Sequence, residues 1–308
     1  MDKSFNFVSL CEQWLKSKKL YVKESTYNQY FNILNKHILP LSESNVSKPI
    51  IVITVQDYLY SLLRKGYSEK TIRDILSVIK DIFSYIESIG INIESPILHI
   101  CMKSRHQKTT SMEESSQKKL CNYILSNLNN KSLGVLIALY TGIRLGELCA
   151  LQWSDIDFAT NTLTISKTLI RVQNKIEETA FPKTRIIITK PKSDKSCREI
   201  PVPDYISKIA FDFVSKKTDY VLSGNSKPIE PRNMQYFFHS IIKEINIHNI
   251  SFHTLRHTFA TRCVEKNFDI KTLSEILGHS SVKITLDRYV HSNMELKRKN
   301  MNKLDFFI

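Results

Sequence analysis

The apolar residues in most of this chain recur at intervals of three and four positions, which places them along one side of an α-helix. The first such segment has its apolar positions at Phe7, Leu10, Cys11, Trp14 and Leu15. Three further segments with this spacing follow, at residues 25–39, 54–66 and 68–90. Because each apolar stripe needs a partner that shields it from water, the first hundred residues are predicted to form one compact unit of four helices.

The helical spacing is interrupted at residues 91–110, where the chain becomes polar and basic. We interpret this stretch as a linker and predict two domains, residues 1–104 and residues 105–308. The second domain begins helical, has strand-like segments rich in Ile, Thr and Val within residues 162–202, and is helical again after Pro203. The predicted fold class is therefore α+β: mainly α, with an all-α N-terminal domain and one small antiparallel β-sheet in the C-terminal domain.

The chain carries a large positive charge, with 44 Lys and Arg against 30 Asp and Glu, a formal net charge of +14. This excess favours a polyanionic partner, and we expect nucleic acid because the sequence shows no basic amphipathic anchor or lipidation signal. No apolar run of transmembrane length and no signal-peptide-like start are present, so we expect a cytoplasmic protein. The six cysteines include no C-x-x-C pair, which indicates reduced thiols and excludes a zinc ribbon.

The pentapeptide HTLRH at residues 253–257 has two interpretations, a metal site or a phosphate site. A zincin helix needs Glu directly after the first His, and Thr254 occupies that position, which disfavours a protease metal site. At 100° per residue, His253 and Arg256 lie only about 60° apart around a helix, so both side chains can reach one phosphate. His257 lies a further 100° round the helix and is predicted to face away from that ligand, in a structural role.

Three other segments carry candidate polar residues, and each also has an ordinary structural explanation. In LGHSSVKITLDRYVH, His279 follows Gly278 and Tyr289 comes ten residues later, although a tyrosine in a helix is usually part of the core. In TGIRLGELCALQW, Arg144 lies at a turn and could simply pair with Glu147. In ITKPKSDKSCREIP, lysines crowd the tip of a predicted hairpin, where such residues are usually just solvated.

Taken together and in this order, these segments resemble the successive motifs of the tyrosine recombinase (phage integrase) family. The matching stretches are TGIRLGELCALQWSDID, PKSDKSCREIPV, HTLRHTFAT, LGHSSVKIT and DRYVH. They cover the whole predicted catalytic domain, and the first domain is similar to the helical, SAM-like core-binding domain of the family. Many relatives from mobile elements carry a further arm-site DNA-binding domain. It is expected to be absent here, since the core-binding helices start within the first ten residues.

The resemblance implies a role for each matching residue. The residues that it places in the catalytic site are Arg144, Lys192, His253, Arg256, His279 and Tyr289. Tyr289 would be the nucleophile, and the two arginines and two histidines would hold the scissile phosphate. The family's hairpin lysine falls on Lys192, with Lys190 as the alternative because the lysine-rich tip permits a shift of two residues. Glu147 corresponds to the acidic residue that supports the first arginine.

The implied chemistry suits these residue types. Attack on a phosphodiester adds negative charge to an anion, and two guanidinium groups provide planar, charged donors that match its oxygens. Tyr289 must lose its phenolic proton, for which His253 is the candidate base, and the leaving 5′-oxygen needs a proton, which Lys192 could give. The covalent 3′-phosphotyrosine product would conserve the bond energy of the DNA strand. We therefore expect no metal, ATP or other cofactor.

The resemblance further implies that the partner is double-stranded DNA with recombination sites, bound by a homotetramer encoded by a bacterial or phage mobile element. The tail ends in the apolar residues Leu304, Phe306, Phe307 and Ile308. We expect it to pack on a neighbouring protomer, with packing within its own chain as the alternative. Two other functions stay open, a type IB topoisomerase that relaxes DNA and a DNA-binding regulator without catalysis.

Overall fold

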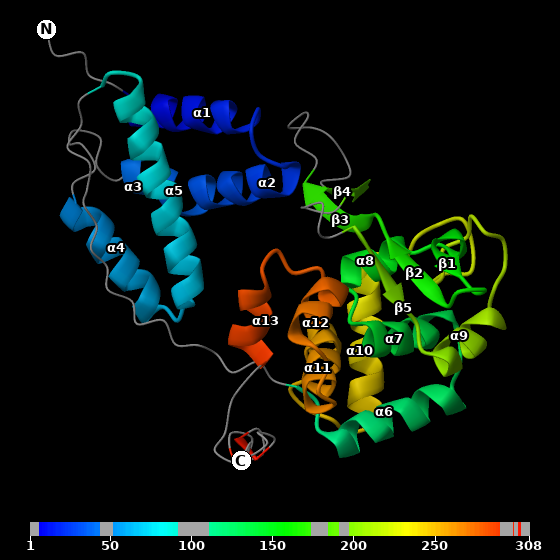
Figure 1. Cartoon of the computed structure of the whole chain (residues 1–308). Coiled ribbons are helices and arrows are strands. Elements are labelled where there is room, and N and C mark those ends of the chain that lie inside the picture. Colours follow the sequence, from blue (N-terminus) through cyan, green and yellow to red (C-terminus); the bar gives the residue numbers. More distant parts are fainter. Residues whose placement is uncertain are drawn as a thin grey trace, which may run out of the picture. The chain divides into compact units, whose positions relative to one another are not determined.

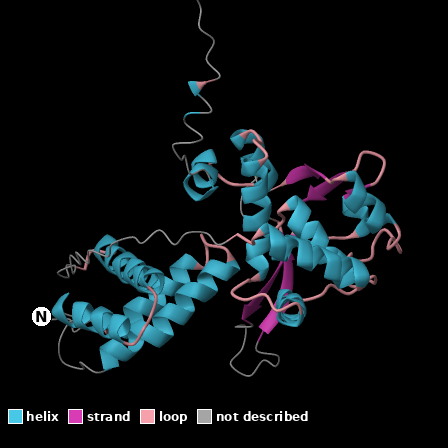
Figure 2. Cartoon of the chain, turned by 90° about the horizontal axis from the view of Figure 1, so that it is seen from below, coloured by secondary structure: helices cyan, strands magenta, loops and turns pink. Residues whose placement is uncertain are grey.

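The computed structural model describes residues 6–43, 52–91, 111–173, 184–190, 197–289, 298 and 301–302. The chain divides into two compact units, one containing helices α1 to α5 and the other beginning with α6 (Figure 1). The predicted boundary between residues 104 and 105 lies outside the described residues. The predicted fold class is confirmed, since the chain is mainly helical with a few short strands (Figure 2). The described strands all lie between α8 and α9 in the sequence.

The first unit is built from amphipathic helices. These are α1 (Phe7–Lys18), α2 (Glu24–Ile33), the π-helical turn η1 (Leu34–Ile38), α3 (Leu39–Glu43), α4 (Val52–Arg64) and α5 (Glu69–Ser88). The side chain of Asn6 accepts hydrogen bonds from the first turn of α1, and Ser68 caps α5 in the same way. The apolar faces meet in a core that includes Trp14, Leu34 and Ile75. The four predicted helices are thus confirmed, with α2 continuing through η1 into α3.

The second unit is organised around α7, in which residues 133–139 are all buried. Its helices are α6 (Glu114–Ser126), α7 (Asn130–Thr141), α8 (Leu145–Ala150), α9 (Asp204–Phe211), α10 (Pro231–Glu244), α11 (Phe252–Glu265), α12 (Ile270–Leu277) and α13 (Val282–Tyr289). Helices α10 and α11 pack against α7, and α13 packs against α11 and α12. Trp153 and Phe238 are among the largest side chains in this core. None of the described helices combines the length and the apolar character needed to cross a membrane.

The described strands form two small sheets. Strands β1 (Ile156–Asp157), β2 (Thr162–Ile165) and β5 (Arg198–Pro201) make an antiparallel sheet in the order β1-β2-β5. Strands β3 (Thr168–Gln173) and β4 (Thr184–Thr189) pair with each other. The expectation of a single sheet was therefore wrong, because β2 pairs with the distant β5 and not with the adjacent β3. In the β2–β5 register Arg198 lies opposite the buried Ile165, so its side chain shares the buried face of the sheet.

Two glycines in the left-handed conformation end α7 and α12. They are Gly142, with φ +66°, and Gly278, with φ +63°. A Cβ atom at Gly142 would lie 2.5 Å from Cδ1 of Phe259, so both the conformation and the available space require glycine there. Each glycine turns the chain sharply at the end of its helix. The residues that follow these turns include two of the predicted site residues, Arg144 and His279.

Candidate active site

Arg256 lies at the centre of the candidate site and contacts the ends of two helices. It belongs to α11, and only 4% of its surface is exposed. Its Nη1 donates to the carbonyl oxygen of Gly142 at 2.7 Å, and its Nη2 donates to that of Leu277 at 2.6 Å. These carbonyls belong to the C-terminal ends of α7 and α12, where the helix dipole favours a cation. Burial, with a smaller contribution from Arg144, lowers the pKa of Arg256 to about 9, which leaves it protonated at neutral pH.

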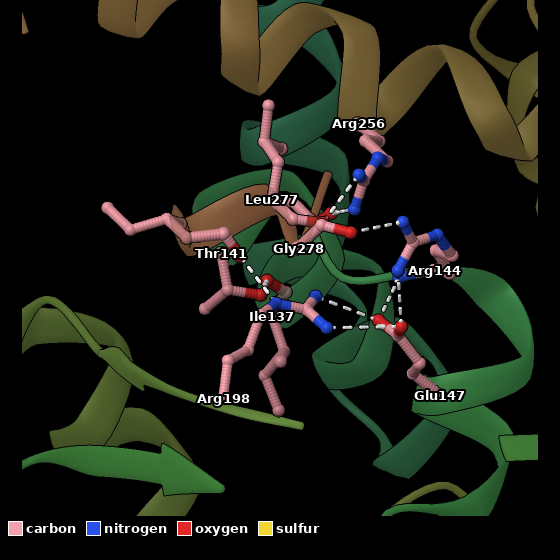
Figure 3. Close-up of polar contacts among 10 residues, drawn as sticks. Ile137, Thr141, Arg144, Glu147, Arg198, Arg256, Leu277 and Gly278 are labelled. Carbon is pink, nitrogen blue, oxygen red and sulfur yellow. Dashed lines mark hydrogen bonds and ion pairs between the residues drawn. The ribbon is translucent and has the colours of Figure 1, made fainter. Parts of the chain in front are cut away.

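Arg144 donates to the same end of α12 as Arg256. Its Nη2 donates to the carbonyl oxygen of Gly278 at 2.9 Å, and its Nη1 donates to Oε1 of Glu147 at 2.7 Å. The side chain is 38% exposed, far more than that of Arg256. Figure 3 shows the two guanidinium groups directed at the adjacent residues Leu277 and Gly278. The arrangement therefore holds two positive charges side by side at one helix end.

Glu147 is buried between two arginines, one of which the sequence did not single out. Its side chain is 2% exposed, and Arg198 donates to both of its oxygens, at 3.1 and 2.9 Å (Figure 3). Arg198 also donates through Nε to the carbonyl oxygen of Ile276 at 2.6 Å. Burial raises the pKa of Glu147, but the hydrogen bonds and charges of Arg198 and Arg144 outweigh it, so the pKa lies below its usual value.

Arg198 is the site residue that sequence reasoning missed. Its side chain is 6% exposed, and it joins β5 to both the Arg144 turn and the last turn of α12. One signal was present in the sequence: Arg198 lies two positions before Ile200 in a strand, so the two side chains point to the same face. A charged residue on the apolar face of a strand indicates a buried partner.

His257 contacts the hydroxyl group of Tyr289, contrary to the prediction that it faces away from the site. Its Nδ1 lies 2.7 Å from the tyrosine oxygen. The prediction gave the direction of His257 around α11, but it assumed that this side of the helix lies outside the site. In the structure α13 packs against α11 and brings Tyr289 there. His253 is exposed, and its ring meets that of His257 edge-on with centroids 4.6 Å apart.

His279 lies on another side of Tyr289. The two rings are nearly parallel, with an interplanar angle of 3° and centroids 6.5 Å apart. Nδ1 of His279 lies 2.8 Å from Oγ1 of Thr285, which fixes the ring. Burial and the arginines of the site, Arg256 first, lower the pKa of His279 to about 3. The imidazole is therefore neutral at pH 7 and is suited to donate or accept a hydrogen bond.

Tyr289, the last residue of α13, is 6% exposed although it carries the predicted nucleophile. Burial raises its pKa, while the charges of Arg256 and Arg288 oppose that rise. The phenol is therefore protonated in the free protein at neutral pH. Arg256, His257, His279 and Tyr289 thus lie together in the structure, although they come from α11, from α13 and from the turn between α12 and α13.

The lysine is the one predicted site residue for which the structure gives no position in the site. Lys190 is exposed just after β4, and Lys192 lies outside the described residues. The choice between them stays a prediction. In the described part of the chain, no group of three or more His, Cys, Asp and Glu side chains is arranged to hold a metal ion.

Comparison with known proteins gives consistent matches along the chain. The profile of the phage integrase family matches residues 110–295, and that of the phage integrase N-terminal SAM-like domain matches residues 6–42. A XerC-like tyrosine recombinase from Caldanaerobacter subterraneus is 28% identical over 83% of this chain and 71% of its own length. The ICEBs1 integrase of Bacillus subtilis is 24% identical over 99% of this chain and 84% of its own.

The fold also matches solved structures. The Tn1549 transposon integrase in complex with a circular intermediate DNA superimposes with a TM-score of 0.78 at 21% identity, covering 98% of this chain and all of that one. A lambda integrase tetramer bound to a Holliday junction gives a TM-score of 0.66 at 16% identity, covering 95% of this chain and 80% of that one. At these identities the likeness establishes the fold of the chain.

Proposed function

Because this chain belongs to the phage integrase family and is a tyrosine recombinase, we propose that it cuts DNA by direct attack of Tyr289 on a phosphodiester. The product is a covalent 3′-phosphotyrosine and a free 5′-hydroxyl group. Attack of a different 5′-hydroxyl on this intermediate then rejoins the strand in a new combination. The observation that supports this most is the buried Tyr289, whose hydroxyl oxygen lies 2.7 Å from Nδ1 of His257 and whose pKa rise on burial is opposed by the charge of Arg256.

The paired arginines are suited to stabilise the transition state of this reaction. A guanidinium group has five N–H donors, and Arg256 uses two of them on helix carbonyls while Arg144 uses two on Glu147 and Gly278. The other N–H groups can donate to the non-bridging oxygens of a bound phosphate. Such an anion would also relieve the repulsion between the two cations. Fixed donors directed at developing charge are worth about 3–4 kcal/mol each in comparable sites.

The remaining roles concern protons. The leaving 5′-oxygen is a poor leaving group and needs a proton, which we assign to Lys192, with Lys190 as the alternative. His253 and His279 complete the phosphate site as neutral hydrogen-bonding groups. Glu147 and Arg198 do not need to touch the DNA, since they hold Arg144 and the end of α12 in position. No step in this scheme requires a metal or ATP.

A suicide substrate tests the proposal. A duplex with a nick beside the cleavage point loses the short fragment that carries the 5′-hydroxyl, so the covalent protein–DNA adduct accumulates. We expect the wild-type protein to form this adduct and Tyr289→Phe to form none. Tyr236→Phe, at an exposed tyrosine of α10, is the matched control and should react like the wild type. An adduct that persists in Tyr289→Phe would show that the nucleophile is another residue.

The proposed assembly is a homotetramer on two double-stranded recombination sites, with the C-terminal tail exchanged between protomers. The tetrameric state of the lambda integrase on a Holliday junction supports the first part. The tail residues 303–308 lie outside the described residues, so their docking is a proposal from the apolar sequence. Unchanged assembly on DNA after deletion of residues 296–308 would contradict it. Relaxation of plasmids that lack any recombination site, without recombinants, would favour the topoisomerase alternative.

A further inference from the structure

The hydrogen bond between Tyr289 and His257 offers a path for the phenolic proton. Nδ1 of His257 lies 2.7 Å from the hydroxyl oxygen of Tyr289, and burial raises the pKa of Tyr289, so the phenol carries its proton. When His257 carries its own hydrogen on Nε2, its Nδ1 presents a lone pair that accepts the hydroxyl proton.

The other two histidines are placed differently. The ring of His253 lies nearly perpendicular to that of His257, with the ring centroids 4.6 Å apart and an interplanar angle of 86°. His279 lies parallel to the tyrosine ring, and its Nδ1 is engaged by Thr285. Among the described hydrogen bonds, the histidine that contacts the hydroxyl oxygen of Tyr289 is His257.

We propose that His257 is a catalytic residue that accepts the phenolic proton of Tyr289 during DNA cleavage. This proposal rests on the assignment of Tyr289 as the nucleophile and replaces His253 as the base. As the bond between the tyrosine oxygen and phosphorus forms, the proton moves to Nδ1 of His257. The bond between phosphorus and the 5′-oxygen breaks, and that oxygen takes a proton from the lysine. Rejoining runs the same transfers backwards and returns the proton to the tyrosine.

The electrostatics of the site would link this step to the presence of DNA. Burial, His253 and the nearby arginines Arg288 and Arg256 lower the pKa of His257 to about 4. In the free protein the imidazole is thus neutral and weakly basic, and the tyrosine keeps its proton. A phosphate anion beside Arg256 and Arg288 offsets their field and makes His257 a stronger base. Proton transfer then becomes favourable only when the substrate is bound.

The test uses the full-length protein and the nicked suicide substrate, with adduct formation followed in a single turnover from pH 6 to pH 10. His257→Asn keeps an amide that can accept the hydroxyl hydrogen bond but cannot take the proton. We expect it to bind DNA like the wild type and to form adduct about 10²–10⁴-fold more slowly at pH 7. The deficit should shrink as the pH rises, because a growing fraction of the tyrosine then ionises without a base. His257→Phe should show the same pH dependence.

Two controls separate this role from a structural one. A substrate with a 5′-bridging sulfur, whose leaving group needs no proton, should not restore the rate of His257→Asn. His253→Asn should lower the rate by a factor that does not change with pH. A wild-type rate in His257→Asn, or a deficit equal at all pH values, would overturn the proposal. A pH-dependent deficit found in His253→Asn alone would assign the base to His253. Adduct in Tyr289→Phe would instead overturn the assignment of the nucleophile.

Discussion

Replacing Arg198 with Met would leave the buried carboxylate of Glu147 without its main partner. The side chains are 6% and 2% exposed, so water cannot replace the lost hydrogen bonds. Removing one partner of a buried ion pair costs about 3–5 kcal/mol of unfolding free energy. Because Arg144 still donates to Glu147, we expect the lower end of that range, about 3 kcal/mol.

Thermal unfolding followed by circular dichroism measures this loss. For a unit of 150–250 residues, each kcal/mol corresponds to about 2–4 °C, so we expect the second unit to melt about 6–12 °C lower. The double variant R198M/E147Q should recover part of the loss, because a neutral amide is cheaper to bury than a carboxylate. Arg232→Met, at an exposed arginine of the same unit, is the matched control and should change stability by less than about 0.5 kcal/mol.

The pH dependence gives an independent check. The arginines lower the pKa of Glu147 below its ordinary 4.5, so their stabilisation is present above that pH and is lost as the pH falls through the lower folded value. In R198M the carboxylate of Glu147 can take up a proton at low pH, which removes the free-energy cost of burying its charge. The difference between wild type and R198M should therefore shrink toward pH 3. A melting temperature within about 2 °C of the wild type at pH 7, or an equal difference at both pH values, would refute the reasoning.

Three further predictions concern packing, protonation and DNA binding. Gly146→Ala should lower stability by about 1–3 kcal/mol in chemical denaturation, because its Cβ would lie 2.6 Å from Oγ1 of Thr168 and 2.8 Å from the carbonyl oxygen of Leu169; an unchanged midpoint would contradict this. The free energy of unfolding should fall between pH 7 and pH 5, by about 1–2 kcal/mol each for His257 and His279. Their pKa values in the folded protein are lowered to about 4 and about 3, so only the unfolded chain takes up protons in this range. A stability that does not change with pH would contradict this. DNA affinity should drop by about 10³-fold or more between 50 and 200 mM salt in fluorescence anisotropy, and a change below about tenfold would argue against a phosphate-dominated interface.

The sequence allowed the elements and most of the site residues to be predicted, because both depend on short-range patterns. Helical spacing determines which face of a segment is apolar, and motif spacing marked Arg144, Arg256 and Tyr289. What it could not supply were contacts between distant elements. The hydrogen bond between His257 and Tyr289 joins residues 32 positions apart in the sequence, and the ion pair between Arg198 and Glu147 joins residues 51 positions apart.

The errors share one cause. Rotation around a single helix says where His257 points, but not which neighbour covers that side. Alternation along β5 indicates that Arg198 points inward, but it does not indicate that the carboxylate of Glu147 lies there. The pairing of β2 with β5 likewise depends on tertiary packing, whereas short-range rules favour adjacent strands. The identity of the hairpin lysine depends on residues next to Lys190 that lie outside the described part of the chain.

Because the arginines donate hydrogen bonds to the carbonyl ends of α7 and α12, the lengths of these two helices affect the geometry of the candidate active site. Arg256 needs the carbonyls of Gly142 and Leu277, and Arg144 needs that of Gly278. One residue inserted within α7 or α12 would turn the end of that helix by about 100° and move it by about 1.5 Å, and the carbonyls would miss the guanidinium groups. We therefore expect substitutions along these helices to be compatible with activity, and the gain or loss of a single residue to abolish it.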